Sequence, residues 1–368
     1  MQRPGAAQFG SALEAVGVPL LALAAAALLF GAFVWFLGKD PLEVYALIYR
    51  GGFASGFSWQ NTLARAAPLI LTALCVALPA QVGLMIIGGE GALVLGGLAA
   101  AVVGHQLDGA PVVVVKLGML GAGMALGALW IMAAGALRHY RGVNETISSL
   151  LLAYIAIAVF NQLVEGPLRD PASLNKPSTF PIGEANRLGN LPGLTVHWGL
   201  GLGIIACLIA YVLVYRTTIG FALRVSGGNL RAGLLAGLPT GRLVLLASAL
   251  GGLAAGLAGA IEVAAVHGAA NSSLIAGYGY AGILVAFIAR QNPLAIVPVA
   301  ILLGGISASG GMLQRRLDMP DAAVLVLEGI AFVLILACET LYGRIDWAAR
   351  ARALGAAKSA PLGTQAAS

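Results

Sequence analysis

The sequence has few charged residues for its length. Only 10% of its 368 residues are Asp, Glu, Lys or Arg, whereas a soluble domain carries roughly 25%. Hydrophobic residues make up 59% of the chain, and the mean hydropathy is +0.91. So few charges cannot cover the surface of a water-soluble domain of this size, which excludes an ordinary soluble enzyme.

Cysteine, histidine and nucleotide-binding motifs are scarce or missing. The three cysteines, Cys75, Cys207 and Cys338, lie in apolar stretches without a CxxC pattern, so we expect packed thiols. The four histidines are scattered, and there is no HExxH motif and no GxxxxGK[ST] loop for ATP. We therefore predict no catalytic residue, no metal site and no cofactor in this chain.

Long apolar runs are what the sequence has in quantity. A hydrocarbon core about 30 Å thick needs about 20 apolar helical residues, and helices satisfy their own backbone groups in lipid. The alternation of a β-barrel is absent. We predict an all-α integral membrane protein, a polytopic bundle of about ten transmembrane helices. The predicted spans are 16–37, 66–87, 91–105, 111–137, 147–164, 198–215, 243–266, 280–290, 294–313 and 322–342.

The distribution of basic residues predicts the orientation, because cytoplasmic loops are rich in Lys and Arg. An N-in/C-in topology puts twelve of them inside, namely Arg3, Arg138, Arg141, Arg216, Arg224, Arg231, Arg242, Arg290, Arg344, Arg350, Arg352 and Lys358. It puts eight outside, namely Lys39, Arg50, Arg65, Arg169, Lys176, Arg187, Arg315 and Arg316. We expect cytoplasmic tails at 1–15 and 346–368 around a single transmembrane domain at 16–345. The net charge of +6 then reflects topology, and no nucleic-acid partner is expected.

Two connections are longer than the rest. Residues 165–197 form a polar, proline-containing loop on the predicted outer side, either a simple connector or a docking surface for an external protein. Residues 216–242 form the largest predicted inner loop, RTTIGFALRVSGGNLRAGLLAGLPTGR. Its helical pieces and partly apolar content exceed what a tether needs.

Three ionisable or polar positions in or near the spans are candidate functional residues, because such groups are expensive in lipid. Glu90 lies among glycines, and Gly88–Gly91 predict a broken helix whose freed backbone groups line a cavity. Glu90 is equally suited to cap a helix start. Glu262 is either an interfacial group that reaches water or a coupling residue, and Tyr278 an interfacial aromatic or a ligand contact.

Four stretches together resemble the inner-membrane permease subunits of ATP-binding-cassette (ABC) importers. The nearest branch serves ribose, other simple sugars and purine nucleosides, and is related to branched-chain amino-acid permeases. The stretches are TLARAAPLILTALCVALPAQVGLMIIGGEGALVLGGLAAA (62–101), RGVNETISSLLLAYIA (141–156), RTTIGFALRVSGGNLRAGLLAGL (216–238) and GYGYAGILVAFIARQNPLAIVPVAILLGGISASGG (277–311).

This resemblance implies a division of labour. Cytoplasmic ABC ATPase subunits would hold ATP and Mg, an extracytoplasmic substrate-binding protein would deliver the solute, and a second permease copy or paralogue would complete the path through bacterial inner-membrane lipid. A cytoplasmic coupling helix in 216–242 would carry ATPase movement to the spans. Its residues are Arg216, Arg224, Asn229, Arg231 and Gly237. The expected substrate path is Gln81, Gly88, Gly89, Glu90, Gly91, Asn144, Glu262 and Tyr278.

The sequence also departs from the pattern of the nucleoside branch. Ile86, Ala92 and Ala153 stand where that branch has polar residues, and Leu230 where it has proline. Loss of polar side chains from the path would favour a solute less polar than a nucleoside, or one of different shape. The alternative function is an ion-coupled secondary transporter that uses Glu90 and Glu262.

Overall fold

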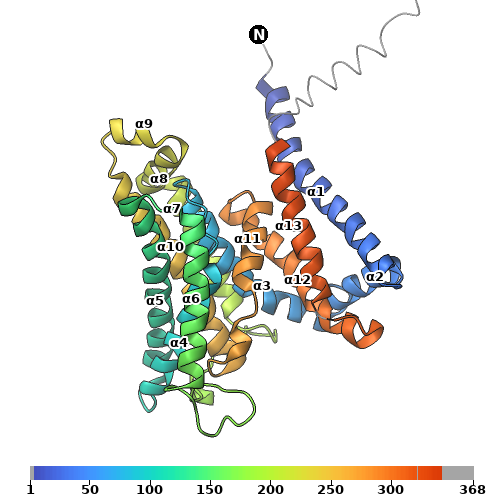
Figure 1. Ribbon diagram of the computed structural model, residues 1–368, viewed down its shortest axis with the longest axis vertical. Coiled ribbons are helices and arrows are strands. Elements are labelled where there is room, and N and C mark those ends of the chain that lie inside the picture. Colours follow the sequence, from blue (N-terminus) through green and yellow to red (C-terminus); the bar gives the residue numbers. More distant parts are fainter. Residues whose placement is uncertain (1–3, 321, 342–368) are drawn as a thin grey trace, which may run out of the picture. The chain divides into compact units, whose positions relative to one another are not determined.

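The computed structural model describes residues 4–320 and 322–341, and within these ranges every regular element is helical. The helices fall into two compact units, one of residues 42–325 and one that holds α1 and most of α13. In chain order the elements are α1 (Pro4–Phe36), α2 (Pro41–Gly52), α3 (Gly56–Ala80), α4 (Gly89–Gln106), α5 (Val112–Arg141), α6 (Glu145–Glu165), η1 (Glu184–Asn186), α7 (Gly199–Arg216), α8 (Thr218–Gly228), α9 (Leu230–Leu235), α10 (Thr240–Ile261), the π-helical turn η2 (Glu262–His267), η3 (Ser272–Leu274), α11 (Tyr278–Ile288), α12 (Pro293–Leu317) and α13 (Ala323–Leu341) (Figure 1).

Each predicted span overlaps a helix in the part of the chain that the structure describes, which agrees with a multi-pass membrane protein. Within the described residues, six helices are long and apolar enough to cross a membrane, or seven if α1 and α2 together form one broken span. The count of ten crossings therefore stays a prediction. Helix α1 already begins at Pro4, inside the predicted tail 1–15. The other predicted tail, 346–368, lies outside the described residues.

The 42–325 unit is built around α10, which packs on α3, α4 and α5. Glycines let these backbones approach closely. A Cβ added at Gly256 would lie 2.1 Å from the carbonyl oxygen of Gly123 in α5, and one at Gly259 would lie 1.8 Å from that of Leu93 in α4. Small residues at crossings are the usual solution for packing helices in lipid. The glycines at these crossings, Gly256 and Gly259 among the chain's 51, therefore serve helix packing.

Two irregular segments interrupt the bundle. The sequence predicted only the first of them, and it predicted that break several residues too late. The predicted span 66–87 is wrong at both ends, because α3 runs from Gly56 to Ala80 and residues 81–88 are not α-helical. The break predicted at Gly88–Gly91 thus lies earlier, and Gly89–Gly91 form the first turn of α4. The second irregular segment, 268–277, precedes the 11-residue helix α11.

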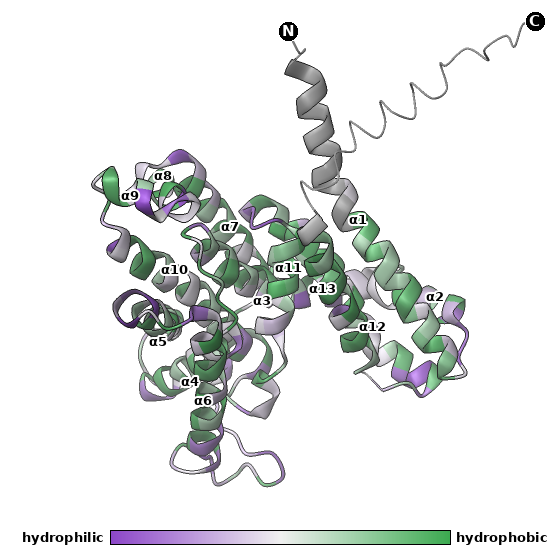
Figure 2. Cartoon of the chain, turned by 45° about the horizontal axis from the view of Figure 1, so that its top comes forward, coloured by the Kyte–Doolittle hydropathy of each residue, from purple (hydrophilic) through white to green (hydrophobic). Residues whose placement is uncertain are grey.

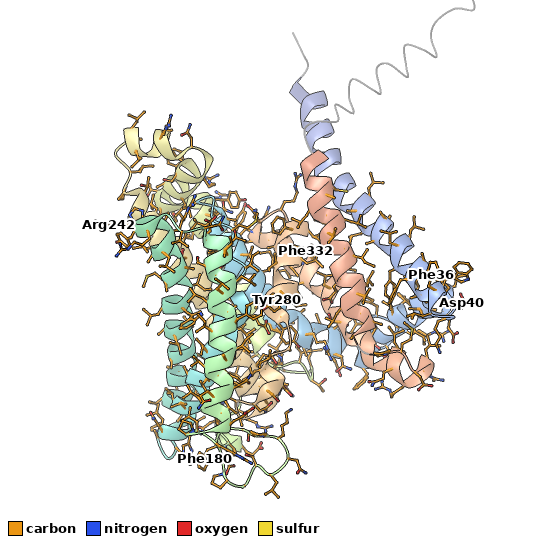
Figure 3. All side chains as sticks on the ribbon, in the orientation of Figure 1. Phe36, Asp40, Phe180, Arg242, Tyr280 and Phe332 are labelled. Carbon is orange, nitrogen blue, oxygen red and sulfur yellow. The ribbon has the colours of Figure 1, made fainter. Side chains whose placement is uncertain are left out.

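The two ends of this unit differ in composition from the helices between them. Helices α8 and α9 lie at one end, and the loop 165–197 lies at the other (Figure 1). Figure 2 shows hydrophobic residues along the helices between them and hydrophilic residues concentrated at helix ends and in connections. Figure 3 places Arg242 and Phe180 at these opposite ends. The loops that we predict on opposite sides of the membrane are therefore separated within this unit.

The loop 165–197 is tied to the chain that follows η2. Thr179 N–H donates to Ala270 O at 2.9 Å, and Ile182 N–H donates to Gly268 O at 3.0 Å. Farther along, His197 Nδ1 accepts from Gly199 N–H at 3.1 Å. Burial lowers the pKa of His197 below its ordinary value, so this imidazole is neutral at pH 7. These bonds give the loop a defined surface.

Candidate functional site

A buried carboxylate joins the starts of two helices. Glu90, in the first turn of α4, is 0% exposed. Its Oε1 accepts from Gly277 N–H at 2.8 Å, and its Oε2 accepts from Gly279 N–H at 2.6 Å. Glu90 therefore caps a helix, as one of the two interpretations held, but the helix is α11 and not its own. Its negative charge lies at the amino ends of both helices, where their dipoles favour it.

The backbone around Glu90 leaves no space for side chains. A Cβ added at Gly279 would lie 2.1 Å from the nitrogen of Glu90, and one at Gly91 would lie 2.7 Å from Cα of Ala153 in α6. From α3, Thr72 Oγ1 donates to Tyr278 O at 2.9 Å. We call this meeting of α3, α4, α6 and α11 the Glu90 junction.

The break 81–88 connects the Glu90 junction to α6. Ile87 N–H donates to Ser149 Oγ at 3.1 Å, and Thr146 Oγ1 donates to Met85 O at 3.0 Å. Met85 N–H also points at Glu145 Oε1, 3.4 Å away, and Glu145 Oε2 lies 3.4 Å from Arg138 Nε. Non-helical backbone at membrane depth needs such partners within the protein. The first turns of α6 provide them.

Helix α8, which holds part of the predicted coupling segment, touches the same break. A Cβ added at Gly227 in α8 would lie 2.2 Å from the carbonyl oxygen of Gln81, so α8 packs directly on the turn that follows α3. Gln81 Nε2 also approaches Gln291 O after α11, at 3.4 Å. Helix α8 is therefore in direct contact with the start of the break that leads to the Glu90 junction.

Comparison with known proteins identifies this architecture. The family described as the branched-chain amino acid transport system / permease component matches residues 58–336. The chain belongs to this family. The glucose ABC transporter permease protein TsgB13 of Haloferax volcanii is 30% identical over 336 residues, which cover 88% of each chain. The guanosine ABC transporter permease protein NupP of Bacillus subtilis is 28% identical, covering 86% of this chain and 92% of its own. The protein is thus a permease subunit of an ABC transporter.

The predicted coupling residues lie together at one end of the permease. The single coupling helix expected there is two helices, α8 and α9, because Asn229 ends the first and caps the second. Asn229 Oδ1 accepts from the N–H groups of Arg231 and Ala232 at 3.0 and 3.1 Å. The guanidinium of Arg224 lies 5.2 Å from the ring centroid of Tyr215. The remaining two are Arg216, which is exposed at the end of α7, and Gly237, which takes a positive φ after α9.

The eight residues predicted for the substrate path do not form one cluster. Gly88, Gly89, Glu90, Gly91 and Tyr278 meet at the Glu90 junction. Gln81 lies beside α8. Asn144 is exposed at the start of α6, which it caps by accepting from Thr146 N–H at 2.9 Å. Glu262 lies elsewhere, at the start of η2. The residues predicted for the substrate path therefore lie in at least three separate regions of the protein.

One interpretation of the sequence was that Glu262 reaches water, and the structure shows that it does not. It is 4% exposed, and its Oε2 lies 3.6 Å from His267 Nε2 across the π-helical turn. The predicted span 243–266 puts Glu262 near its outer end, but hydropathy does not predict the π-helical turn that buries it. Within the described residues, no hydrogen bond or ion pair joins Glu262 to Glu90.

The three apolar residues that depart from the nucleoside-branch pattern are buried in the structure, and so they do not line an exposed path in this chain. Ile86, Ala92 and Ala153 are each 0% exposed within this single chain. Ala153 packs on Gly91, and Ile86 and Ala92 belong to one hydrophobic cluster. Their apolar side chains therefore change the core and not an exposed path. Their burial means that these three residues provide no argument for or against a nucleoside as the solute.

A cavity of about 480 Å³ lies elsewhere, between α3, α5, α7 and α10. Its lining is apolar throughout, with Leu74, Leu120, Met124, Ile209 and Leu253 among its residues. A polar solute would lose its hydrogen bonds there without replacement. This cavity suits hydrocarbon and is not a candidate for the solute path.

Proposed function

We propose that this permease imports a small neutral polar solute, either nucleoside-like or nucleobase-like or a simple sugar, delivered by an extracytoplasmic binding protein. The names of its relatives, which include glucose and guanosine permeases, support these two solute classes. The observation that carries the proposal is the contact of α8 with Gln81. It joins a cytoplasmic surface, where ATPase movement would arrive, to a broken-helix junction at membrane depth.

Helices α8 and α9 are suited to bind cytoplasmic ATPase subunits. Leu235 is 90% exposed, and Phe221 and Leu234 are exposed near Arg224 and Arg231. Exposed apolar side chains beside positive charges are typical of a protein interface. ATP and Mg would bind to those partners, which fits a chain without a P-loop. ATP then biases the permease between two arrangements, because α8 holds the break directly.

The remaining parts of the proposed complex follow from the two ends of the 42–325 unit. The hydrogen-bonded loop 165–197 offers the outer surface for the binding protein. A second permease copy or a paralogue completes the path. We propose a bacterial inner membrane, about ten crossings and the N-in/C-in topology that the count of basic residues predicts. Within the 42–325 unit, Arg138 and Arg216 end α5 and α7, and Arg242 lies in the first turn of α10, which makes the α8–α9 end the proposed cytoplasmic one.

An ion-coupled carrier is disfavoured by the same geometry. Both oxygens of Glu90 already accept backbone N–H groups, so protonation of one oxygen would weaken one of the two hydrogen bonds that cap α11. A coupling carboxylate must instead change its state in every cycle.

The test is reconstitution in proteoliposomes of the permease together with the ATPase subunits and the binding protein that co-purify with it. We expect ATP-dependent accumulation of labelled guanosine or glucose. A parallel preparation whose ATPase cannot hydrolyse ATP should accumulate neither. Uptake that persists there and follows an imposed proton or sodium gradient would overturn the proposal.

A further inference from the structure

Two exposed tyrosines flank the first turn of α4. Tyr154 in α6 directly follows Ala153, which packs on Gly91. Tyr280 in α11 directly follows Gly279, which packs on Glu90. Tyr280 also interacts electrostatically with both Glu90 and Tyr154. The two phenol rings therefore belong to one region beside the Glu90 junction, although they come from different helices.

The depth of these tyrosines is unusual for a membrane protein. Tyrosine is enriched at the two membrane interfaces, but Tyr154 is near the middle of the 21-residue helix α6. Figure 3 shows Tyr280 between the levels of Arg242 and Phe180, which mark the two ends of the unit. Tyr154 is therefore far from both ends of its crossing, and Tyr280, although it is the first residue of the predicted span 280–290, lies at mid-height in the unit because α11 begins there.

Their exposure makes this depth informative. Tyr154 is 58% exposed and Tyr280 37%, and neither hydroxyl is hydrogen-bonded to another of the described residues. A hydroxyl that faces hydrocarbon loses its hydrogen bonds to water without replacement. Partners for these hydroxyls would be available in an aqueous path.

The polar character continues along the same helix. Toward its carboxyl end α6 carries Asn161 and Gln162, seven and eight residues after Tyr154, which is two helical turns. Between Glu145 and Glu165 the helix has no charged residue. The same face also exposes the apolar Ile147 and Leu151, so it offers hydroxyl, amide and apolar groups without a charge, a combination suited to a neutral solute.

We propose that Tyr154 and Tyr280 line the solute path and contact a neutral ring-shaped solute, stacking on its faces and hydrogen-bonding to its polar groups. A nucleobase presents such a π-face to aromatic side chains, and a sugar ring presents C–H groups and hydroxyls. This inference rests on the proposed function and gives its solute a site that the buried Glu90 carboxylate cannot provide.

Thiol labelling tests the path without knowledge of the solute. Tyr154→Cys and Tyr280→Cys would be made in a chain whose Cys75, Cys207 and Cys338 are replaced by alanine. A membrane-impermeant cationic methanethiosulfonate would be applied from each side of the membrane to the complete complex, with and without ATP. We expect labelling more than tenfold faster than at a lipid-facing site in at least one of these conditions.

The matched control is Leu208→Cys in α7. Leu208 is 49% exposed and lies eight residues from the end of α7 that carries Arg216, whereas Tyr154 lies nine residues from the start of α6, so the depths correspond. Labelling is scored only on permease that co-purifies with its ATPase, which removes misfolded protein. Rates at positions 154 and 280 within twofold of the rate at 208, from both sides, would overturn the proposal.

Solute selectivity provides a second readout. Tyr280→Phe keeps the ring and removes the hydroxyl, whereas Tyr280→Leu removes both. If the ring is the main contact, the leucine variant should lose at least tenfold of uptake, and the phenylalanine variant less than threefold. Equal uptake by the leucine variant and the native permease would contradict solute contact at this residue. Failure of the native complex to transport would instead count against the proposed function, and the labelling rates would still decide whether this face is aqueous.

Discussion

The Glu90 junction and the α8–α9 segment differ in how many of their groups find partners within the chain. At the junction, both carboxylate oxygens of Glu90 are used and the glycines touch neighbouring backbone. In the α8–α9 segment, Leu235 is almost fully exposed, and a Cβ at Gly228 would have nothing within 4 Å. The first region is complete within one chain. The second has free surface, which is where we propose that the ATPase subunits bind.

The largest effect should come from one methyl group at the junction. Gly279→Ala would place Cβ 2.1 Å from the nitrogen of Glu90, an overlap between backbone atoms that no side-chain movement relieves. We expect almost no folded permease, measured as monodisperse protein after detergent extraction. Gly228→Ala is the matched change in α8 and should extract normally. Similar yields for the two variants would mean that the two regions are equally tolerant.

Removal of the carboxylate should have the next largest effect. Glu90→Ala leaves Gly277 N–H and Gly279 N–H buried without an acceptor, at a cost of about 3 kcal/mol or more. We expect a lower midpoint of thermal unfolding in detergent and loss of solute uptake. Glu90→Gln retains one acceptor oxygen and should lie between alanine and the native protein. Normal uptake by Glu90→Ala would remove Glu90 from the mechanism.

Charge reversal in the α8–α9 segment should separate folding from coupling. Arg224 is exposed and interacts mainly with the ring of Tyr215. Arg224→Glu should therefore change the free energy of unfolding by less than about 1 kcal/mol. Stimulation of ATP hydrolysis by solute-loaded binding protein should fall about tenfold, since like charges at an interface cost several kcal/mol. Arg224→Gln, which removes the charge without reversing it, is the control. Full stimulation in the glutamate variant would exclude this residue from the ATPase contact.

Hydropathy predicted the helices well but not the points at which they end. The break 81–88 includes Val82, Leu84 and Ile86, which are as apolar as any span. A hydropathy average cannot separate extended apolar backbone from helix when both are buried in protein. Pro79 and Gly83, with a φ of +77°, were the local signals that favoured an earlier end.

The candidate site was predictable only in part, for a different reason. Glycines around Glu90 indicated an unusual backbone, and that residue is indeed central. Its partners Gly277 and Gly279 lie 187 and 189 residues away, and a single sequence does not reveal such pairing. Tyr154 was missed because a lone tyrosine in an apolar helix carries no pattern. Only its exposure at mid-helix separates it from an interfacial aromatic.

The smallest expected effect concerns the ion pair that lies between the two compared regions. Arg138 Nε and Glu145 Oε2 are 3.4 Å apart, and the Arg138 side chain is half exposed. Arg138→Gln, Glu145→Gln and the double variant form a cycle whose coupling free energy should be about 1 kcal/mol or less, because solvent screens the arginine. Glutamine at 145 keeps an oxygen toward Met85 N–H, so the break 81–88 should stay attached to α6 and uptake should exceed half of the native rate. Glu145→Ala loses that oxygen and should be worse than either glutamine variant. The contrary outcome is that Arg138→Gln alone abolishes uptake while the thermal midpoint is unchanged. Arg138 would then act at the ATPase contact, and the surface that depends on a partner would include the end of α5 as well as α8 and α9.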